Sequence, residues 1–168
     1  MHKASQQPWF DNTIFVLLGD HGKLVGNPDS EMPQSYNHIP LMFYAPALLT
    51  AEEKENFGGQ IDVAPTLLGM LRINYIQNNL GIDLLKEERP CMFFSADNML
   101  GVKDTKHFYI YDTESKQEFN YNIHNGTLSP ATANTTFDLL KTYAFSMLQT
   151  TEYLIRKQLT TDKPHSNP

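Results

Sequence analysis

The chain has 168 residues, which suits one domain with a sizeable core, and its 40% hydrophobic and 19% charged residues are globular values. Its formal net charge of −6 argues against a general nucleic-acid binder, which normally presents a basic face. The single cysteine, Cys91, excludes an intrachain disulfide and a cysteine-rich zinc site. No apolar run approaches the roughly 20 residues that span a bilayer, and no signal peptide opens the chain, so we expect it to be soluble.

The first predicted element is a continuous apolar run at residues 14–18, which indicates a strand buried on both faces, as in a parallel sheet. Asp20 and His21 follow it directly, between Gly19 and Gly22, which would let the backbone turn and approach a ligand closely. In open α/β sheets, ligands bind beyond the carboxyl ends of strands. The pair therefore indicates a metal site. The alternative is an ordinary loop in which the aspartate caps a turn.

Loop composition follows at residues 23–36, and a second strand is predicted at residues 39–44. We expect a short, charged helical turn at residues 50–56. A further helix begins near Asp62, which has the character of an N-cap, with Pro65 in the first turn. Apolar residues recur at helical spacing and predict the face that packs on the sheet: Val63, Leu67, Met70 and Leu71.

Short strands are predicted at residues 92–95, 107–111 and 118–122, with a turn at residues 112–115 between the last two. Together they indicate a small antiparallel hairpin sheet. We expect one domain with three portions: residues 1–90 with part of the core sheet, residues 91–130 with the small sheet, and residues 131–160 with a terminal helix.

The terminal helix is predicted at residues 135–159, with Thr135 and Asp138 spaced like a capping box. The tail at residues 160–168 is expected to fray. An apolar stripe runs along the helix and must be covered: Phe137, Leu140, Ala144, Met147, Leu148, Thr151, Leu154 and Ile155.

Three segments resemble a known family: NTIFVLLGDHG at residues 12–22, NHIPLMFYAP at residues 37–46 and QIDVAPTLLGML at residues 60–71. In this order they are similar to the carboxyl-terminal part of the sulfatase branch of the alkaline phosphatase superfamily, closest to the lipoteichoic-acid-synthase-like phosphoglycerol transferases. The resemblance covers about residues 7–90. It implies an α/β fold with a mostly parallel central sheet and flanking helices, to which the small antiparallel sheet and the long terminal helix are added.

The resemblance also implies a metal-dependent transferase or hydrolase of phosphoryl or sulfo-esters, acting on cell-envelope polymers or lipid head groups. Asp20 and His21 match the family's late pair of metal ligands. Their oxygen and imidazole donors suit a divalent ion, with Mn²⁺ expected and Zn²⁺, Mg²⁺ or Ca²⁺ as alternatives. His38 matches a histidine that contacts the substrate phosphate or sulfate in some relatives. Its alternative is a surface histidine that caps the start of the second strand.

The family's nucleophile and earlier metal ligands lie well upstream of the Asp-His pair, whereas only 19 residues precede Asp20. We therefore expect this chain to be part of a longer enzyme and to be inactive by itself. The alternative is a non-catalytic α/β binding or scaffold module of the same fold.

The expected partners are a phosphate- or sulfate-ester substrate and the upstream part of the parent chain, and no nucleic acid. A free sheet edge at residues 14–18 would also let two copies pair as a dimer. The resemblance implies a parent that is anchored in a membrane, with its catalytic domain outside the cytoplasm.

Overall fold

The computed structural model describes residues 1–160, and its backbone contacts divide the chain into unit 1 (Met1–Glu55) and unit 2 (Asn56–Pro168). Residue 90, where the sequence places a change of organisation, lies inside unit 2. The prediction of a frayed tail at residues 160–168 lies, apart from residue 160, outside the described residues.

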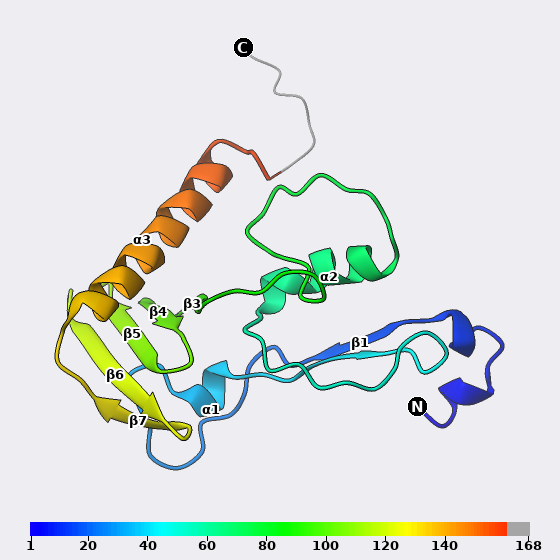
Figure 1. The fold of residues 1–168 in the computed structure, drawn as a ribbon, viewed down its shortest axis with the longest axis horizontal. Helices are drawn as coiled ribbons and strands as arrows, with labels where there is room; N and C mark the ends of the chain where they lie inside the picture. The colour runs from blue at the N-terminus through cyan, green and yellow to red at the C-terminus, as the bar shows by residue number, and fades with distance from the viewer. Residues whose placement is uncertain (161–168) are drawn as a thin grey trace. The chain divides into compact units, whose positions relative to one another are not determined.

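Unit 1 is built around a two-stranded antiparallel sheet. Strand β1 (Phe15–Leu18) pairs with β2 (Leu41–Tyr44), with Phe15 opposite Tyr44 and Leu18 opposite Leu41 (Figure 1). Two short 3₁₀ turns, η1 (Ala4–Gln6) and η2 (Phe10–Asn12), precede β1, and a one-turn helix, α1 (Gln34–Asn37), precedes β2. Aromatic rings from the two strands and η2 meet at one end of the sheet: Phe10, Phe15 and Tyr44.

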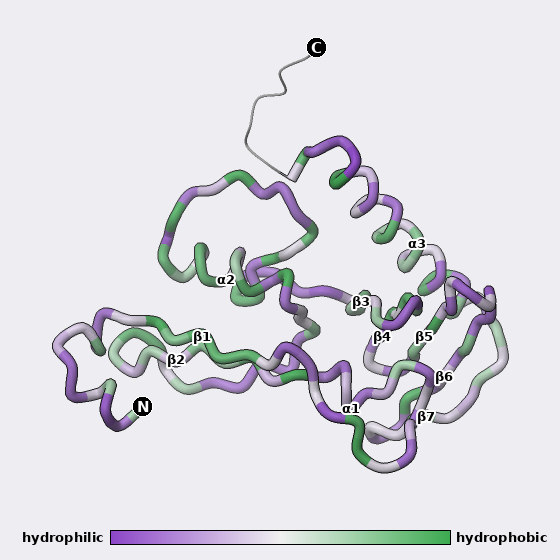
Figure 2. Tube along the Cα trace, turned by 180° about the vertical axis from the view of Figure 1, so that it is seen from behind, coloured by the Kyte–Doolittle hydropathy of each residue, from purple (hydrophilic) through white to green (hydrophobic). Residues whose placement is uncertain are grey.

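The mostly parallel central sheet expected from the apolar run is not found among the described residues. The pair β1–β2 is antiparallel, and so is every pair in the larger sheet. Hydrophobic residues lie along both strands of unit 1 (Figure 2), yet Leu17, Leu18 and Met42 are 45%, 43% and 56% exposed. An apolar run marks a strand with much surface to bury, but it does not encode the direction of the neighbouring strand.

The predicted helical turn at residues 50–56, where unit 1 ends and unit 2 begins, is absent: the backbone there is irregular and the side chains are exposed. Three of its charged residues are glutamates in an unbroken charged run, and no apolar stripe is present to stabilise a helix. The turn η3 (Gln60–Asp62) leads into α2 (Val63–Met70), close to the predicted helix. Its buried positions are Pro65 and Thr66, whereas Leu71 from the predicted packing face is 50% exposed.

The larger sheet of unit 2 is an antiparallel meander of five strands in the order β3-β4-β5-β6-β7. The strands are β3 (Met92–Ala96), β4 (Met99–Lys103), β5 (His107–Asp112), β6 (Glu118–His124) and β7 (Thr127–Pro130). The small antiparallel sheet is thus confirmed, and it is larger than the sequence predicted, because β4 and β7 were missed.

Both missed strands follow two-residue hairpin turns. Asp97 and Asn98 join β3 to β4, and Asn125 and Gly126 join β6 to β7; all four have positive φ, from 48° to 77°. Such turns match the twist of the strands they connect, and an Asn-Gly pair is the strongest short-range hairpin signal. The sequence therefore contained the evidence for β7.

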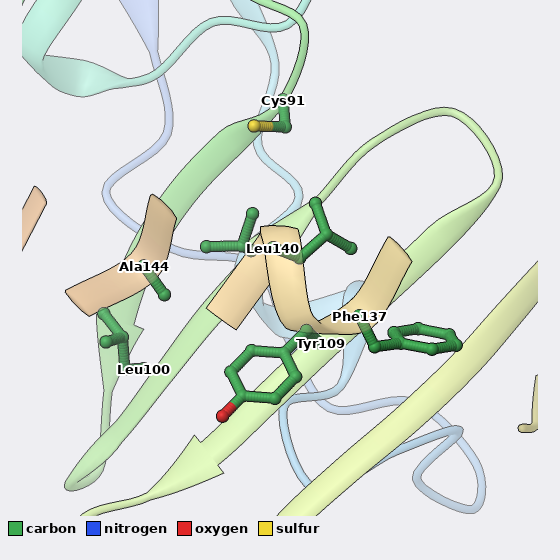
Figure 3. Packing of buried hydrophobic residues seen from close by; sticks show 7 residues of the cluster. Cys91, Leu100, Tyr109, Phe137, Leu140 and Ala144 are labelled. Carbon is green, nitrogen blue, oxygen red and sulfur yellow. The ribbon is translucent and has the colours of Figure 1, made fainter. Parts of the chain in front are cut away.

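The terminal helix α3 (Thr135–Arg156) packs on β4 and β5 and encloses the main core of unit 2 (Figure 3). Its N-cap is Asn134, whose Oδ1 accepts hydrogen bonds from the backbone N–H groups of Thr136 (2.9 Å) and Phe137 (3.3 Å). The predicted capping box at Thr135 is therefore wrong by one residue. The buried cluster consists of Cys91, Leu100, Val102, Tyr109, Phe137, Leu140 and Ala144.

Two neighbouring leucines of α3 provide a matched test of this packing. Leu140 is 7% exposed in the core, whereas its neighbour Leu139 is 67% exposed to solvent. We expect Leu140→Ala to lower the free energy of unfolding by about 2–4 kcal/mol, because it removes buried apolar groups and leaves a cavity. Leu139→Ala should change it by less than about 0.5 kcal/mol. Urea unfolding followed by circular dichroism measures both, and equal effects would contradict the observed packing.

Candidate metal centre at the end of strand β1

Asp20 and His21 lie just past the carboxyl end of β1, where the sequence predicted them. The backbone N–H of Gly19 donates to the carbonyl of Pro40 (3.2 Å), which extends the β1–β2 pairing by one step before the chain turns away. Both side chains that follow face solvent, with exposed fractions of 89% for Asp20 and 55% for His21. A carboxylate and an imidazole are thus presented side by side at the tip of a strand.

The imidazole of His21 is held in one tautomer. Its Nδ1 lies 2.7 Å from the backbone carbonyl oxygen of Gly22. A carbonyl oxygen can only accept, so Nδ1 carries the proton and donates. In the neutral ring, Nε2 is then the unprotonated nitrogen, which is the state that binds a metal.

The carboxylate of Asp20 is stabilised in its anionic form. The backbone N–H of His21 donates to Oδ1 (2.9 Å), and this bond is the largest cause that lowers the pKa of Asp20. The backbone N–H of Asp20 itself contributes in the same direction. A carboxylate that stays ionised is the form in which aspartate coordinates a cation.

The two donor atoms are close enough to share one ion. Oδ2 of Asp20 and Nε2 of His21 are 3.7 Å apart. Ligands that each lie about 2.1 Å from one ion are separated by about 3.0–3.4 Å, so a small side-chain movement would suffice. The pair therefore fits a divalent cation as two of its ligands.

The remaining ligands of such a site are not found nearby. Across residues 1–160, no group of three or more His, Cys, Asp or Glu side chains is arranged to hold a metal ion. Catalytic zinc sites usually have three protein ligands, and other divalent ions take more donors. Asp20 and His21 alone are therefore an incomplete set of ligands for such a site.

Gly22 connects this pair to α1. Its backbone N–H donates to the carbonyl oxygen of Tyr36 (2.7 Å). A Cβ atom on Gly22 would lie 2.1 Å from the backbone oxygen of Ser35, so only glycine allows this approach. The ring of Tyr36 stacks on that of His21, with 4.9 Å between centroids and 20° between planes. Tyr36 has no signal in the sequence, because a tyrosine inside a predicted loop belongs to no periodic pattern or motif.

His38 is brought to the same end of the small sheet. It follows α1, and its backbone N–H donates to Gln34 (2.9 Å) as the C-cap. Because β1 and β2 are antiparallel, the segment that enters β2 runs beside the residues that leave β1. The side chain of His38 is exposed, and its role as a substrate contact stays a prediction.

Comparison with known families adds to this geometry. Residues 1–73, which include the Asp-His pair, β2 and α2, match the model of the sulfatase family. We call these residues the sulfatase segment, because they resemble that family. The resemblance expected from the sequence is thereby confirmed.

A curated relative extends the match beyond this sulfatase segment. The chain is 28% identical to lipoteichoic acid synthase 2 of Bacillus subtilis (strain 168) over 129 residues, which cover 66% of this chain and 19% of the relative. The chain thus spans about a fifth of the length of that protein.

Solved structures show the same fold. An alkaline phosphatase superfamily protein from Vibrio parahaemolyticus superposes with a TM-score of 0.75 at 17% identity, covering 96% of this chain and 40% of that one. A putative sulfatase from Bacteroides thetaiotaomicron VPI-5482 superposes with a TM-score of 0.58 at 18% identity, covering 90% of this chain and 38% of that one. At these identities the likeness concerns the fold alone, and it includes the part of the chain beyond the sulfatase segment. The α/β class is therefore confirmed, with an alkaline-phosphatase-like arrangement.

Proposed function

We propose that this chain forms part of a metal-dependent enzyme that transfers or hydrolyses phosphoryl or sulfo-esters. The observation that carries the proposal is the paired donor set, in which Nε2 of His21 and Oδ2 of Asp20 face each other at 3.7 Å. The sulfatase-family match of the same residues supports it.

Asp20 and His21 are the metal ligands in this proposal, and His38 contacts the phosphate or sulfate group of the substrate. A bound divalent ion would lower the pKa of a nucleophile and neutralise charge on the transferred group. The nucleophile and the other ligands would come from sequence outside this chain. The ion is Mn²⁺, with Zn²⁺, Mg²⁺ or Ca²⁺ as alternatives, since carboxylate and imidazole accept all of them to some degree.

The substrate proposed is a cell-envelope polymer or lipid head group, handled as by a phosphoglycerol transferase. The similarity to lipoteichoic acid synthase 2 supports this choice. The complete protein would then be membrane-anchored, with its catalytic domain outside the cytoplasm. Within residues 1–160, no helix is both long and apolar enough to cross a membrane.

A second candidate is a non-catalytic α/β module that keeps the fold. The incomplete donor set within the described range favours this reading. The two candidates differ in whether the Asp-His pair binds a divalent ion at all.

Metal binding by the chain itself distinguishes them. Mn²⁺ added to the isotope-labelled chain should broaden the amide signals of residues 20–22 and 36–38 before all others. We expect Asp20→Asn and His21→Gln each to weaken this effect at least about tenfold, since even outer partners of a metal site change affinity 10–100-fold. Asp11→Asn and His2→Gln are matched controls, because both alter exposed residues of unit 1. Equal broadening in the two site variants and the wild type would reject the metal centre and favour the non-catalytic module.

A further inference from the structure

The ring of Tyr36 covers one face of the candidate ligand His21. The stacked geometry, 4.9 Å between centroids at 20°, is close to parallel. Offset stacking is a favourable arrangement for aromatic rings and adds to the gain from their buried area. The imidazole is nonetheless 55% exposed, so the stack restrains the ring without closing it off from solvent.

The backbone around Tyr36 is itself fixed. The carbonyl of Pro33 accepts from the backbone N–H groups of Tyr36 and Asn37 (both 3.1 Å) and from Nδ2 of Asn37 (3.0 Å). On the preceding side, Met32 is 2% exposed, and its carbonyl accepts from Oγ of Ser30 (3.0 Å). The one-turn helix α1 therefore has local anchors on both sides of its aromatic residue.

Two independent contacts then join α1 to the metal-ligand segment. One is the hydrogen bond from Gly22 N–H to the carbonyl of Tyr36, and the other is the ring stack on His21. The carbonyl of Gly22 is also the acceptor for Nδ1–H of His21. Tyr36 thus restrains both the imidazole ring and Gly22, the residue whose carbonyl sets its tautomer.

We propose that Tyr36 is a positioning residue that holds His21 with Nδ1 protonated and Nε2 directed at a bound divalent ion. This inference rests on the proposed function for the role of the ion. The positioning of the imidazole is a property of the metal-free chain and can be measured without any ion.

The test compares Tyr36→Leu, which removes the aromatic face, with Tyr36→Phe, which keeps it. Nitrogen chemical shifts of the His21 ring at alkaline pH, where imidazoles are neutral, report which nitrogen carries the proton. The wild type and Tyr36→Phe should show the Nδ1–H form, and Tyr36→Leu should shift toward a mixture of both tautomers. Mn²⁺ affinity should fall about tenfold in Tyr36→Leu and change less than about twofold in Tyr36→Phe, as expected for loss of an orienting partner.

Tyr44→Leu is the matched control, since this aromatic belongs to the other end of the same sheet, against Phe15. It perturbs unit 1 and should leave the His21 tautomer unchanged. A wild-type ring that is protonated mainly on Nε2, or a Tyr36→Leu ring with unchanged shifts and affinity, would overturn the positioning role. Failure of the metal centre alone would appear differently, as Mn²⁺ binding that is unaffected by Asp20→Asn and His21→Gln.

Discussion

Replacing Asp62 by asparagine should lower the free energy of unfolding of unit 2 by about 3–5 kcal/mol, the usual cost of removing one partner from a buried ion pair. Asp62 is fully buried, and the side chain of its partner Arg89 is 7% exposed. Such a pair is not strongly stabilising compared with apolar residues, but either charge left alone in the interior is costly.

The carboxylate of Asp62 has further partners that asparagine could not all satisfy. Its Oδ2 accepts from the backbone N–H of Gly59 (2.8 Å), and its Oδ1 accepts from Ile82 N–H (2.8 Å) and from Nη2 of Arg89. An amide has one acceptor oxygen, so one backbone donor would face an NH₂ group. Nη2 of Arg89 also donates to the carbonyl of Leu80 (2.7 Å), so the pair ties three separate segments together.

A double-mutant cycle with Arg89→Met separates the ion pair from these other bonds. The double variant should be destabilised by less than the sum of the single variants, because each charge is costly only while the other is missing. The circular dichroism signal of α3 reports the unfolding of unit 2. Tryptophan fluorescence would report unit 1 instead, because the only tryptophan, Trp9, belongs to that unit. As a control, Asp97→Asn changes an exposed residue of unit 2 and should alter the free energy of unfolding by less than about 0.5 kcal/mol. Additive single effects, or a cost of Asp62→Asn below about 1 kcal/mol, would refute the role of this pair.

In a full-length enzyme that contains this chain, Asp20→Ala or His21→Ala should lower turnover of a phosphate or sulfate ester at least about a thousandfold. Loss of a ligand weakens the binding of the ion, which stabilises charge in the transition state by several kcal/mol. Each 1.36 kcal/mol of that stabilisation corresponds to about a tenfold change in rate. The fold should be preserved, because both side chains are mostly exposed and neither lies in the core. Steady-state kinetics with matched circular dichroism spectra measure both effects.

The same assay tests the role of His38. His38→Ala should reduce turnover by about tenfold, because a group that only contacts the substrate contributes less than a metal ligand. His2→Ala changes an exposed histidine at the start of unit 1 and should have no effect. Near-normal turnover in Asp20→Ala would remove the basis of the active-site assignment, and a silent His38→Ala would support the alternative of a surface histidine that caps the start of the second strand.

Local sequence signals were sufficient for several parts of this protein. The apolar run ending in Gly-Asp-His predicted both β1 and the two candidate ligands at its carboxyl end, where the structure has them. The stripe from Phe137 to Ala144 predicted α3 and its buried face, because 3.6-residue periodicity reports burial along one helix. The Asn-Gly turn before β7 is also a local signal in the sequence.

Long-range partners were decided only by the tertiary structure. Asp62 has the local character of a helix cap, yet its carboxylate bonds Ile82 and Arg89, which lie 20 and 27 residues further along the chain. Thr66 is buried in α2 because its hydroxyl accepts from the backbone N–H of Leu84 (3.0 Å). The antiparallel direction of β1–β2 and the stack of Tyr36 on His21 likewise depend on how the loop between the strands folds back. Periodicity describes what one element must bury, whereas the identity and direction of its partners depend on which distant segment meets it.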